Sequence, residues 1–376
     1  MTEANKPPNC IYHDNELRER GLGPAFAGPF YYFRGKQHIM GRLKYLFVFT
    51  LPALAFISFH STGWLAYLPV IEAFLFVPLM ELFFAPNANN LEEGEKERRT
   101  YALFYKFALR AVIPFQLIWG YLMLQQTQGE IDTVTFIGRV LSYGIMCGVM
   151  GINVAHELGH KRSKLDQFFA KVLLTTSLYT HFFLEHNFGH HKNVGTPEDP
   201  SSARRGEWVY TFWVRSISYT YRSAWRIGIA RSKGNPLNNE MIWYTLVQIT
   251  LLYIIFQGFG MTGLIAFVGS ALTGWILLET VQYIEHYGLS RKKVNEHRYE
   301  TVNPSHSWNS DHQWGRAILF ELSRHSDHHY LPHKDYVALD HHDESPQLPT
   351  GYPGMMLLSL IPPLFMRIIH PRIPVD

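Results

Sequence analysis

Six long apolar stretches constrain the fold of this chain more than any other feature of its sequence. Most are close to the ~20 residues that a helix needs to cross a bilayer. One such stretch alone can be a buried helix of a soluble protein, but six of them, arranged in pairs, favour a membrane protein. The predicted spans are 45–60, 64–85, 103–124, 134–155, 241–258 and 261–283. We therefore predict an all-α, polytopic membrane protein with six transmembrane helices.

Lysine and arginine gather on one side of these spans. The connections 61–63, 125–133 and 259–260 contain neither residue, whereas the longer segments are basic. Because basic loops stay on the cytoplasmic side, we predict that both termini and most of the polar mass are cytoplasmic. The predicted parts of this single functional unit are an N-terminal segment (1–44), helices 1–4 (45–155), a cytoplasmic region (156–240), helices 5–6 (241–283) and a last cytoplasmic region (284–376).

Composition excludes several classes of protein. The net charge of +3 is too small to favour nucleic acid as a partner. Cys10 and Cys147 form no CxxC pair, so we expect neither a zinc ribbon nor a built-in iron–sulfur site. The stretch "GFGMTG" matches a dinucleotide fingerprint, but it lies between two predicted spans rather than after a strand. We interpret it as a turn.

Nine of the twenty histidines fall in four clusters, "HELGH", "EHNFGHH", "YIEHYG" and "RHSDHH". Residues three or four apart share one face of a helix, so each cluster can present two or three imidazoles to one point. Burying imidazoles together is costly unless a metal binds them. The predicted metal ligands are His156, His160, His186, His190, His191, His286, His325, His328 and His329.

The stretch "HELGH" alone is the HExxH signature of zinc peptidases, in which Glu157 would act as the base. A catalytic zinc takes three protein ligands, however, so nine histidines suit two transition-metal ions better. Imidazole binds iron, copper, zinc and nickel, and ligand type leaves the metal open. A metal transporter would need polar groups along the spans, which offer few.

Carboxylates beside the clusters are the expected partners of these histidines, because a metal-bound imidazole usually donates its second nitrogen to a carboxylate or carbonyl. The predicted partners are Glu157, Glu185, Asp199, Glu285 and Asp327, together with the nearby His181, His306 and His312. We expect His341 and His342, in the polar stretch "LDHHDESPQ", to be exposed to solvent. The bulky Trp64, Phe74, Phe76 and Trp119 are candidates for closing a substrate tunnel through the first four spans.

Four stretches, "HELGHK", "EHNFGHHKNVGTPEDP", "QYIEHYGL" and "LSRHSDHH", together resemble the signatures of a known family in order and separation. They are similar to those of the integral-membrane alkane 1-monooxygenases (alkane ω-hydroxylases) of the fatty acid desaturase/hydroxylase superfamily. The resemblance implies a non-haem di-iron centre, with two iron ions held by the nine histidines in a cytoplasmic, histidine-rich helical cap. It also implies O₂-dependent hydroxylation of the terminal methyl group of n-alkanes taken from the bilayer, at the bacterial inner membrane.

The resemblance further implies that electrons come from rubredoxin, which rubredoxin reductase recharges. The basic residues predicted to dock this donor are Arg204, Arg205, Arg291, Lys292 and Lys293. Membrane lipids are the other expected partners, and nucleic acid is not one. Fatty acyl desaturases and aryl-methyl hydroxylases share the histidine clusters, so such a sibling reaction is the main alternative.

Overall fold

The computed structural model of this chain describes residues 41–296 and 298–374. From Tyr45 onward, the described residues form one compact unit. The predicted N-terminal segment, 1–44, lies outside the described residues except for positions 41–44.

Helices make up nearly all of the regular structure, as predicted. The α-helices are α3 (Thr50–His60), α4 (Leu68–Ile71), α5 (Val77–Phe83), α6 (Glu93–Tyr101), α7 (Leu103–Gln126), α8 (Thr133–Met146), α9 (Asn153–Gly159), α10 (Lys164–Thr176), α11 (Phe182–Glu185), α12 (His191–Asn193), α13 (Val209–Ser232), α14 (Glu240–His286), α15 (Gln313–Ile318), α16 (His325–Tyr330), α17 (Tyr352–Ser359) and α18 (Pro362–Ile369). Three π-helical segments are η4 (Glu72–Phe76), η5 (Cys147–Ile152) and η6 (His186–His190). The strands β1 (Lys293–Asn295) and β2 (Arg298–Tyr299) pair as an antiparallel hairpin.

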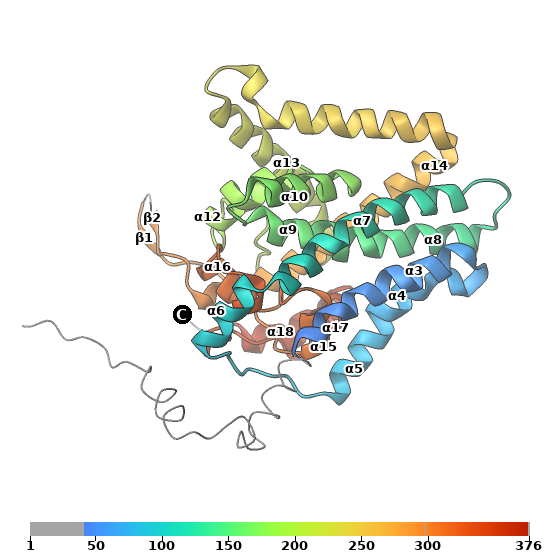
Figure 1. Cartoon of the computed structure of the whole chain (residues 1–376). Helices are drawn as coiled ribbons and strands as arrows, with labels where there is room; N and C mark the ends of the chain where they lie inside the picture. The colour runs from blue at the N-terminus through green and yellow to red at the C-terminus, as the bar shows by residue number, and fades with distance from the viewer. Residues whose placement is uncertain (1–40, 297, 375–376) are drawn as a thin grey trace, which may run out of the picture. The chain divides into compact units, whose positions relative to one another are not determined.

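Five helical runs in the described part of the chain are long and apolar enough to cross a membrane, whereas six were predicted. They are Gly41–His60, Gly63–Phe83, Leu103–Gln126, Thr133–Gly159 and Glu240–His286. The last run is the 47-residue α14, which contains both the fifth and the sixth predicted spans. A straight helix of that length would be about 70 Å long, over twice the thickness of the hydrocarbon core. Instead, Gly260 has a non-helical φ of 62° and ψ of −163°, and α14 bends sharply (Figure 1).

Small residues let α8 and η5 pack closely against the second arm of α14. A Cβ atom on Gly144 would lie 2.4 Å from the Cβ of Thr273, and one on Gly274 would lie 2.8 Å from the Cβ of Cys147. Close backbone approach of this kind is how helices associate in lipid, where the hydrophobic effect does not drive them together. The packing holds the arm that ends at His286 beside the helical run that leads to His156.

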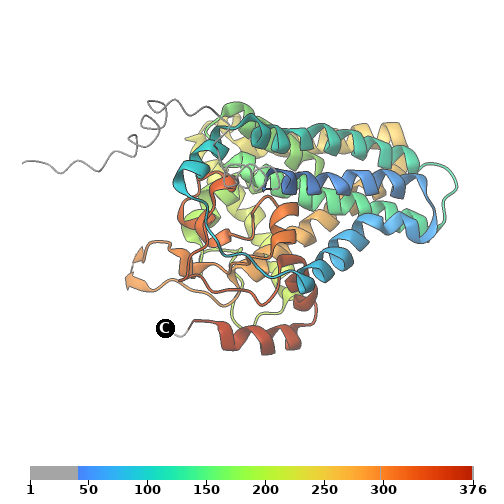
Figure 2. The ribbon, with the colours of Figure 1, turned by 60° about the horizontal axis from the view of Figure 1, so that its bottom comes forward.

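The helices α8, η5 and α9 form one continuous run that carries the chain to its first clustered histidines. The run begins at Asp132, whose carboxylate accepts a hydrogen bond from the backbone N–H of Thr135 (3.0 Å). It continues to Gly159, so the boundary predicted between residues 155 and 156 falls inside a helix. The α7–α8 connection lies at one end of the long helices, while α9, α12 and α16 lie toward the other (Figure 1). Figure 2 likewise shows the segments that follow α14 away from that connection.

Candidate metal centre

The structure brings the nine predicted histidines together as two compact groups. The five-histidine group is His156, His160, His186, His191 and His328, and the four-histidine group is His190, His286, His325 and His329. Within each group the ring nitrogens that could bind a metal lie within 4.8 Å of one another. Every member is buried except His191, which is half-buried.

The clusters of the sequence do not map onto these groups one to one. His186 and His191 lie in the five-histidine group, whereas His190, between them in sequence, lies in the other. The reason is the π-helical turn η6, in which the backbone N–H of His191 donates to the carbonyl of His186, so that residues five apart share a face. The cluster does present two imidazoles to one group, as expected, but the pair is His186 and His191 rather than His186 and His190.

Helix α16 contributes to both groups as well. His325 and His329 are four residues apart and share a face, which belongs to the four-histidine group. Successive helical residues are turned by about 100°, so His328 diverges from His329 and joins the five-histidine group. One short helix thus supplies ligands to both sides of the centre.

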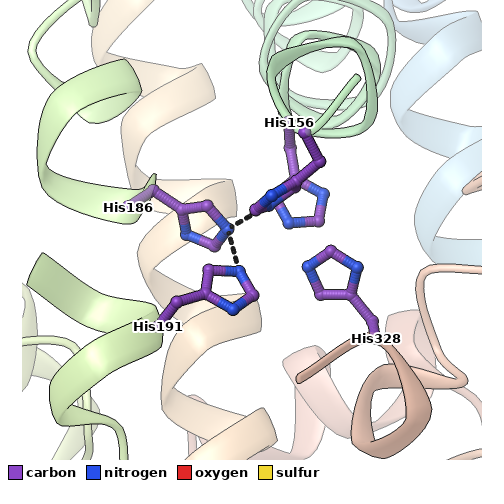
Figure 3. Close-up of side chains that lie close together, drawn as sticks. His156, His186, His191 and His328 are labelled. Atoms are coloured by element: carbon purple, nitrogen blue, oxygen red, sulfur yellow. Dashed lines mark hydrogen bonds between the residues drawn. The ribbon is translucent and has the colours of Figure 1, made fainter. Parts of the chain in front are cut away.

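The geometry of the ring nitrogens fits metal binding. Four pairs of Nε2 atoms lie 2.9–3.2 Å apart: His186–His191, His186–His160, His190–His329 and His286–His325. Two nitrogens bound at about 2.1 Å to one metal, and about 90° apart around it, would be about 3.0 Å from each other. The Nε2 atoms of His156 and His328 are buried without a hydrogen-bond partner among the described residues. Figure 3 shows His156, His186, His191 and His328 pointing toward one region.

Burial keeps these imidazoles in the form that binds metal. Burial and the neighbouring imidazoles hold the pKa of His160, His186 and His328 well below its usual value of 6.5. The same causes lower the pKa of His191, His325 and His329. A neutral imidazole does not have to lose a proton before it binds a metal. The all-nitrogen donor set suits a transition metal such as iron.

Two of the predicted carboxylates lie against histidines of the four-histidine group. The Nδ1 atom of His190 donates to Oδ2 of Asp199 (2.9 Å), which also accepts from the hydroxyl of Ser202 (2.6 Å). Burial alone would raise the pKa of Asp199, but His190 and Ser202 bring that pKa below its usual value. Oε2 of Glu285 lies 3.3 Å from Nε2 of His325.

Glu157 and Asp327 contact groups other than the nine histidines. Oε1 of Glu157 accepts from the backbone N–H of Tyr336 (3.2 Å) and forms an ion pair with Lys161 (2.5 Å). Asp327 accepts a hydrogen bond from Nζ of Lys334 (2.7 Å) and also contacts Nε2 of His342.

His342 and His341, in the polar stretch "LDHHDESPQ", were predicted to be exposed to solvent. The expectation was wrong: their side chains are 25% and 15% exposed. His342 Nε2 lies 2.7 Å from Asp327, and His341 Nδ1 lies 2.6 Å from Asp311. The polar stretch "LDHHDESPQ" folds back onto the helix that carries the last histidine cluster, because buried carboxylates there need partners.

Glu185 and His181 are buried close to η6. Burial raises the pKa of Glu185 well above its usual value, and its Oε1 atom has no hydrogen-bond partner among the described residues. A Cβ atom on Gly189 would lie 2.5 Å from that oxygen, so a larger residue at this position would require the Glu185 carboxylate to move. His181 packs its ring against Tyr179, and burial lowers its pKa to about 3.

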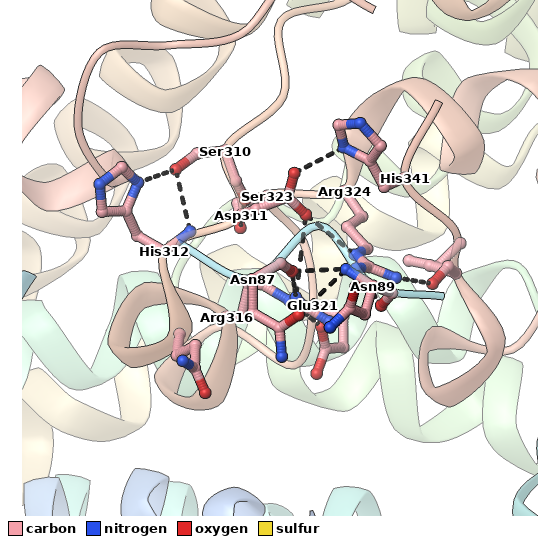
Figure 4. A network of polar contacts seen from close by, with 12 residues as sticks. Asn87, Asn89, Ser310, Asp311, His312, Arg316, Glu321, Ser323, Arg324 and His341 are labelled. Carbon is pink, nitrogen blue, oxygen red and sulfur yellow. Dashed lines mark hydrogen bonds and ion pairs between the residues drawn. The ribbon is translucent and has the colours of Figure 1, made fainter. Parts of the chain in front are cut away.

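His306 and His312 lie on the segment between α14 and α16. The carbonyl of His306 lies 3.4 Å from Nδ1 of His286, and its own Nε2 lies 3.1 Å from Glu300. His312 accepts a hydrogen bond at Nδ1 from the hydroxyl of Ser310 (3.0 Å), away from the two groups of imidazoles. His306 can therefore orient a predicted ligand, whereas His312 belongs to a different network (Figure 4).

Arg324, which was not among the predicted site residues, directly precedes His325 and is only 1% exposed. Its guanidinium donates to the carbonyls of Leu339 (2.7 Å), Asn89 (3.0 Å) and Asn87 (3.3 Å) and contacts Asp311 (3.3 Å) (Figure 4). These bonds fix the start of α16 and so the direction of its histidines. Its neighbourhood in "LSRHSDHH" gives no local signal, because two of the partners lie more than 230 residues earlier in the chain.

A narrow apolar cavity of about 70 Å³ reaches the histidines of both groups. Phe74, Val149 and Leu277 are among its apolar lining residues, and Glu285 lies in its wall. The histidines that line it are His156, His186, His190 and His325. Of the four bulky residues suggested as tunnel plugs, Phe74 lines this cavity, whereas Trp64 is 78% exposed at the far end of the span.

Comparison with known proteins places this arrangement in a family. The fatty acid desaturase family matches residues 133–359, more than half of the chain. Alkane 1-monooxygenase 1 from Pseudomonas aeruginosa is 40% identical over 327 residues, which cover 84% of this chain and 85% of the relative. The chain belongs to the alkane 1-monooxygenase family.

Two further similar proteins support the same family assignment. Alkane 1-monooxygenase 2 from the same organism is 37% identical over 326 residues, covering 84% of this chain and 86% of the relative. The hydroxylase component of xylene/toluene monooxygenase from Pseudomonas putida is more distant, at 25% identity over 347 residues and 88% of each chain. The resemblance inferred from the histidine clusters is thus confirmed. With its five apolar helices, the protein is an integral membrane oxidoreductase of the monooxygenase class.

The basic residues predicted to dock an electron donor differ in their availability. Arg204, Arg205 and Lys292 line a polar cavity of about 910 Å³ that also reaches Asp199. Lys293 is exposed on β1. The guanidinium of Arg291, in contrast, donates to the backbone carbonyls of Glu300 (2.8 Å) and Lys192 (3.0 Å), so it holds the hairpin in place.

Proposed function

We propose that this protein hydroxylates the terminal methyl group of n-alkanes to primary alcohols, using O₂ and two iron ions held by the nine histidines. One observation carries the proposal: an apolar cavity ends at imidazoles from both histidine groups. An alkane offers no polar group for recognition, so an apolar channel that leads to a metal centre is the kind of site it requires. The names of the similar proteins support the same substrate class.

The irons, when bound, would supply the oxidising power that inserts one atom of O₂ into a C–H bond, while two electrons and two protons reduce the other atom to water. The protein aligns the substrate and keeps the site dry. Phe74, Val149 and Leu277 hold the hydrocarbon chain and exclude water from the cavity. Asp199 holds His190 in one tautomer through its Nδ1–H. Glu285 is the carboxylate in the cavity wall, beside His325.

We further propose that the two arms of α14 cross the membrane separately, which gives six spans with both termini and the metal centre on the cytoplasmic face of the bacterial inner membrane. The bend at Gly260 and the absence of lysine and arginine from the 61–63, 125–133 and 259–260 connections support this topology. In a variant without Cys10 and Cys147, cysteines introduced at Glu130 and Met261 would react with a membrane-impermeant reagent from the periplasmic side only. Labelling from the cytoplasmic side would refute the topology.

The proposed electron donor is rubredoxin, recharged by its reductase. We propose that rubredoxin docks at the polar cavity lined by Arg204, Arg205 and Lys292, since a basic surface steers an acidic partner. Asp199 lines the same cavity and accepts a hydrogen bond from His190. One hydrogen bond therefore joins the cavity wall to a member of the four-histidine group.

Gas chromatography of the products tests the function. Membranes that contain the protein would receive rubredoxin, its reductase, NAD(P)H and a mixture of n-alkanes with an aryl methyl compound. We expect primary alcohols that require O₂ and rubredoxin and that are lost in His186→Ala and His325→Ala. The variant Arg204→Glu/Arg205→Glu should lower the rate at limiting rubredoxin but not at saturation.

Other products would change the assignment. Benzyl alcohols with the alkanes untouched would make the protein an aryl-methyl hydroxylase, and alkenes would make it a desaturase. Peptide cleavage by a preparation that contains zinc and no iron would favour the HExxH peptidase and refute the di-iron proposal.

A further inference from the structure

A third cavity, of about 300 Å³, lies where α6, α7 and the start of α10 meet. Its lining is strongly basic and contains Arg99, Lys106, Arg110, Lys161 and Arg162. Ser163, which begins α10 and accepts a hydrogen bond from the backbone N–H of Asp166 (3.3 Å), also lines it. Neither the apolar cavity nor the polar cavity beside Asp199 shares these residues.

Carboxylates neutralise some of these cations but not all. The ion pairs are Arg99–Glu95 (2.6 Å), Arg110–Asp166 (2.9 Å), Lys161–Glu157 (2.5 Å) and Lys161–Asp335. Lys106 and Arg162 are exposed and form no ion pair with any residue in 41–296 or 298–374. Five cations against four carboxylates leave an excess of one positive charge at this place.

Exposed apolar side chains flank the basic lining. On α7, Leu103, Lys106, Phe107 and Arg110 are spaced i, i+3, i+4 and i+7, so they form one stripe along the helix. Leu103 is 82% exposed and Phe107 is 71% exposed. On α10, Leu165 and Phe168 are 53% and 59% exposed, directly after Arg162 and Ser163. Helix α7 is one of the candidate membrane spans, so such side chains would contact lipid rather than water.

We propose that this cavity binds an anionic membrane phospholipid, with the phosphate held by Lys106 and Arg162. A phosphodiester carries a single negative charge, which matches the excess charge of the lining. Basic pockets between transmembrane helices are known to bind anionic headgroups. The N-terminus of α10 at Ser163 adds the positive end of a helix dipole. The acyl chains lie along Leu103 and Phe107 on α7 and along Phe168 on α10.

The geometry gives this lipid a specific position relative to the metal centre. Lys161 directly follows His160, a member of the five-histidine group, and pairs with Glu157 on the same helix. The headgroup therefore lies next to the C-terminal end of α9. The proposal requires only that the chain is embedded in a bilayer, and it is independent of the reaction that the metal centre performs.

Native mass spectrometry of the full-length protein in detergent tests the proposal. The purified, delipidated protein would be titrated with dioleoylphosphatidylglycerol and, separately, with dioleoylphosphatidylcholine. We expect the phosphatidylglycerol to bind about fivefold more tightly, since the lining has an excess of one positive charge and each such charge favours an anionic lipid by about fivefold. The double variant Lys106→Gln/Arg162→Gln should remove most of this preference.

Two further variants make the result specific. Lys106→Arg/Arg162→Lys keeps both charges and should keep the preference, which separates loss of charge from loss of folding. Arg222→Gln/Arg226→Gln removes two exposed arginines of α13 and should leave the preference unchanged. Equal binding of the two lipids, or equal loss in this control, would overturn the proposal. Displacement of the phosphatidylglycerol by millimolar inorganic phosphate would also overturn it, because the site would then take a soluble phosphate.

Discussion

The two histidine groups lie side by side, but they differ in what surrounds them. The five-histidine group has more imidazoles. In each group two Nδ1 atoms have no hydrogen-bond partner among the described residues: those of His186 and His191 in the five-histidine group, and those of His325 and His329 in the four-histidine group. The four-histidine group has one imidazole fewer, but Asp199 contacts His190 and Glu285 contacts His325. Asp199 contacts the second ring nitrogen of a ligand, whereas Glu285 reaches Nε2 of His325, the nitrogen that would bind a metal, so Asp199 is the carboxylate that distinguishes the four-histidine group.

The two groups also differ in their connection to the polar cavity, which bears on the route by which electrons and protons could reach the metal centre. Asp199 connects the four-histidine group to the large polar cavity, whereas no member of the five-histidine group lines that cavity. Both groups border the apolar cavity through His156, His186, His190 and His325. A substrate bound in the apolar cavity would therefore border both groups, whereas the polar cavity reaches only the four-histidine group, through Asp199.

The largest expected effect comes from removing one histidine from each group. His286→Ala leaves three imidazoles in its group, whereas His160→Ala leaves four in the other. We expect His286→Ala to lose one of the two metal ions and more than about 100-fold in alcohol formation, above the range for residues that only orient a ligand. His160→Ala should retain more metal. Metal analysis per chain together with product analysis checks this, and equal metal loss in both variants would remove the distinction between the groups.

A smaller effect is expected from the carboxylates that orient ligands. Asp199→Asn removes the charge that His190 Nδ1–H contacts and should lower metal affinity or activity by about 10–100-fold. Asp327→Asn is the matched control, because Asp327 contacts Lys334 and His342 rather than a member of either group. It should lower the thermal unfolding temperature with less effect on metal affinity, measured by competition with a chelator. A similar loss of affinity in both variants would contradict this assignment.

The smallest effect is expected for Glu157→Gln. Glutamine can still accept from the backbone N–H of Tyr336 but loses the ion pair with Lys161, so we expect a lower unfolding temperature and nearly normal alcohol formation. Glu285→Gln, in the cavity wall beside His325, should reduce activity more. Both are checked by rate measurements at saturating alkane. An inactive Glu157→Gln that keeps its metal would instead give Glu157 a direct part in the chemistry.

Local patterns in the sequence determined the class of the protein and its nine candidate ligands. Apolar runs mark helices in lipid because length and composition alone decide whether a segment can cross the bilayer. Histidines at helical spacing mark a metal centre because buried imidazoles need a common partner. Each apolar run and each histidine cluster spans no more than about 20 residues, so both can be recognised without knowledge of the fold.

Only the tertiary structure decided how those histidines are divided and what holds them. The π-turn at η6 separates His190 from His186, although their spacing of four suggests a common face. Asp327 lies beside two predicted ligands, yet it binds Lys334 and His342 because the following segment folds back over α16. Arg324 is fixed by the carbonyls of Asn87 and Asn89, which lie more than 230 residues earlier in the chain. Contacts of this kind depend on which distant segments share a buried space, and helical periodicity carries no information about that.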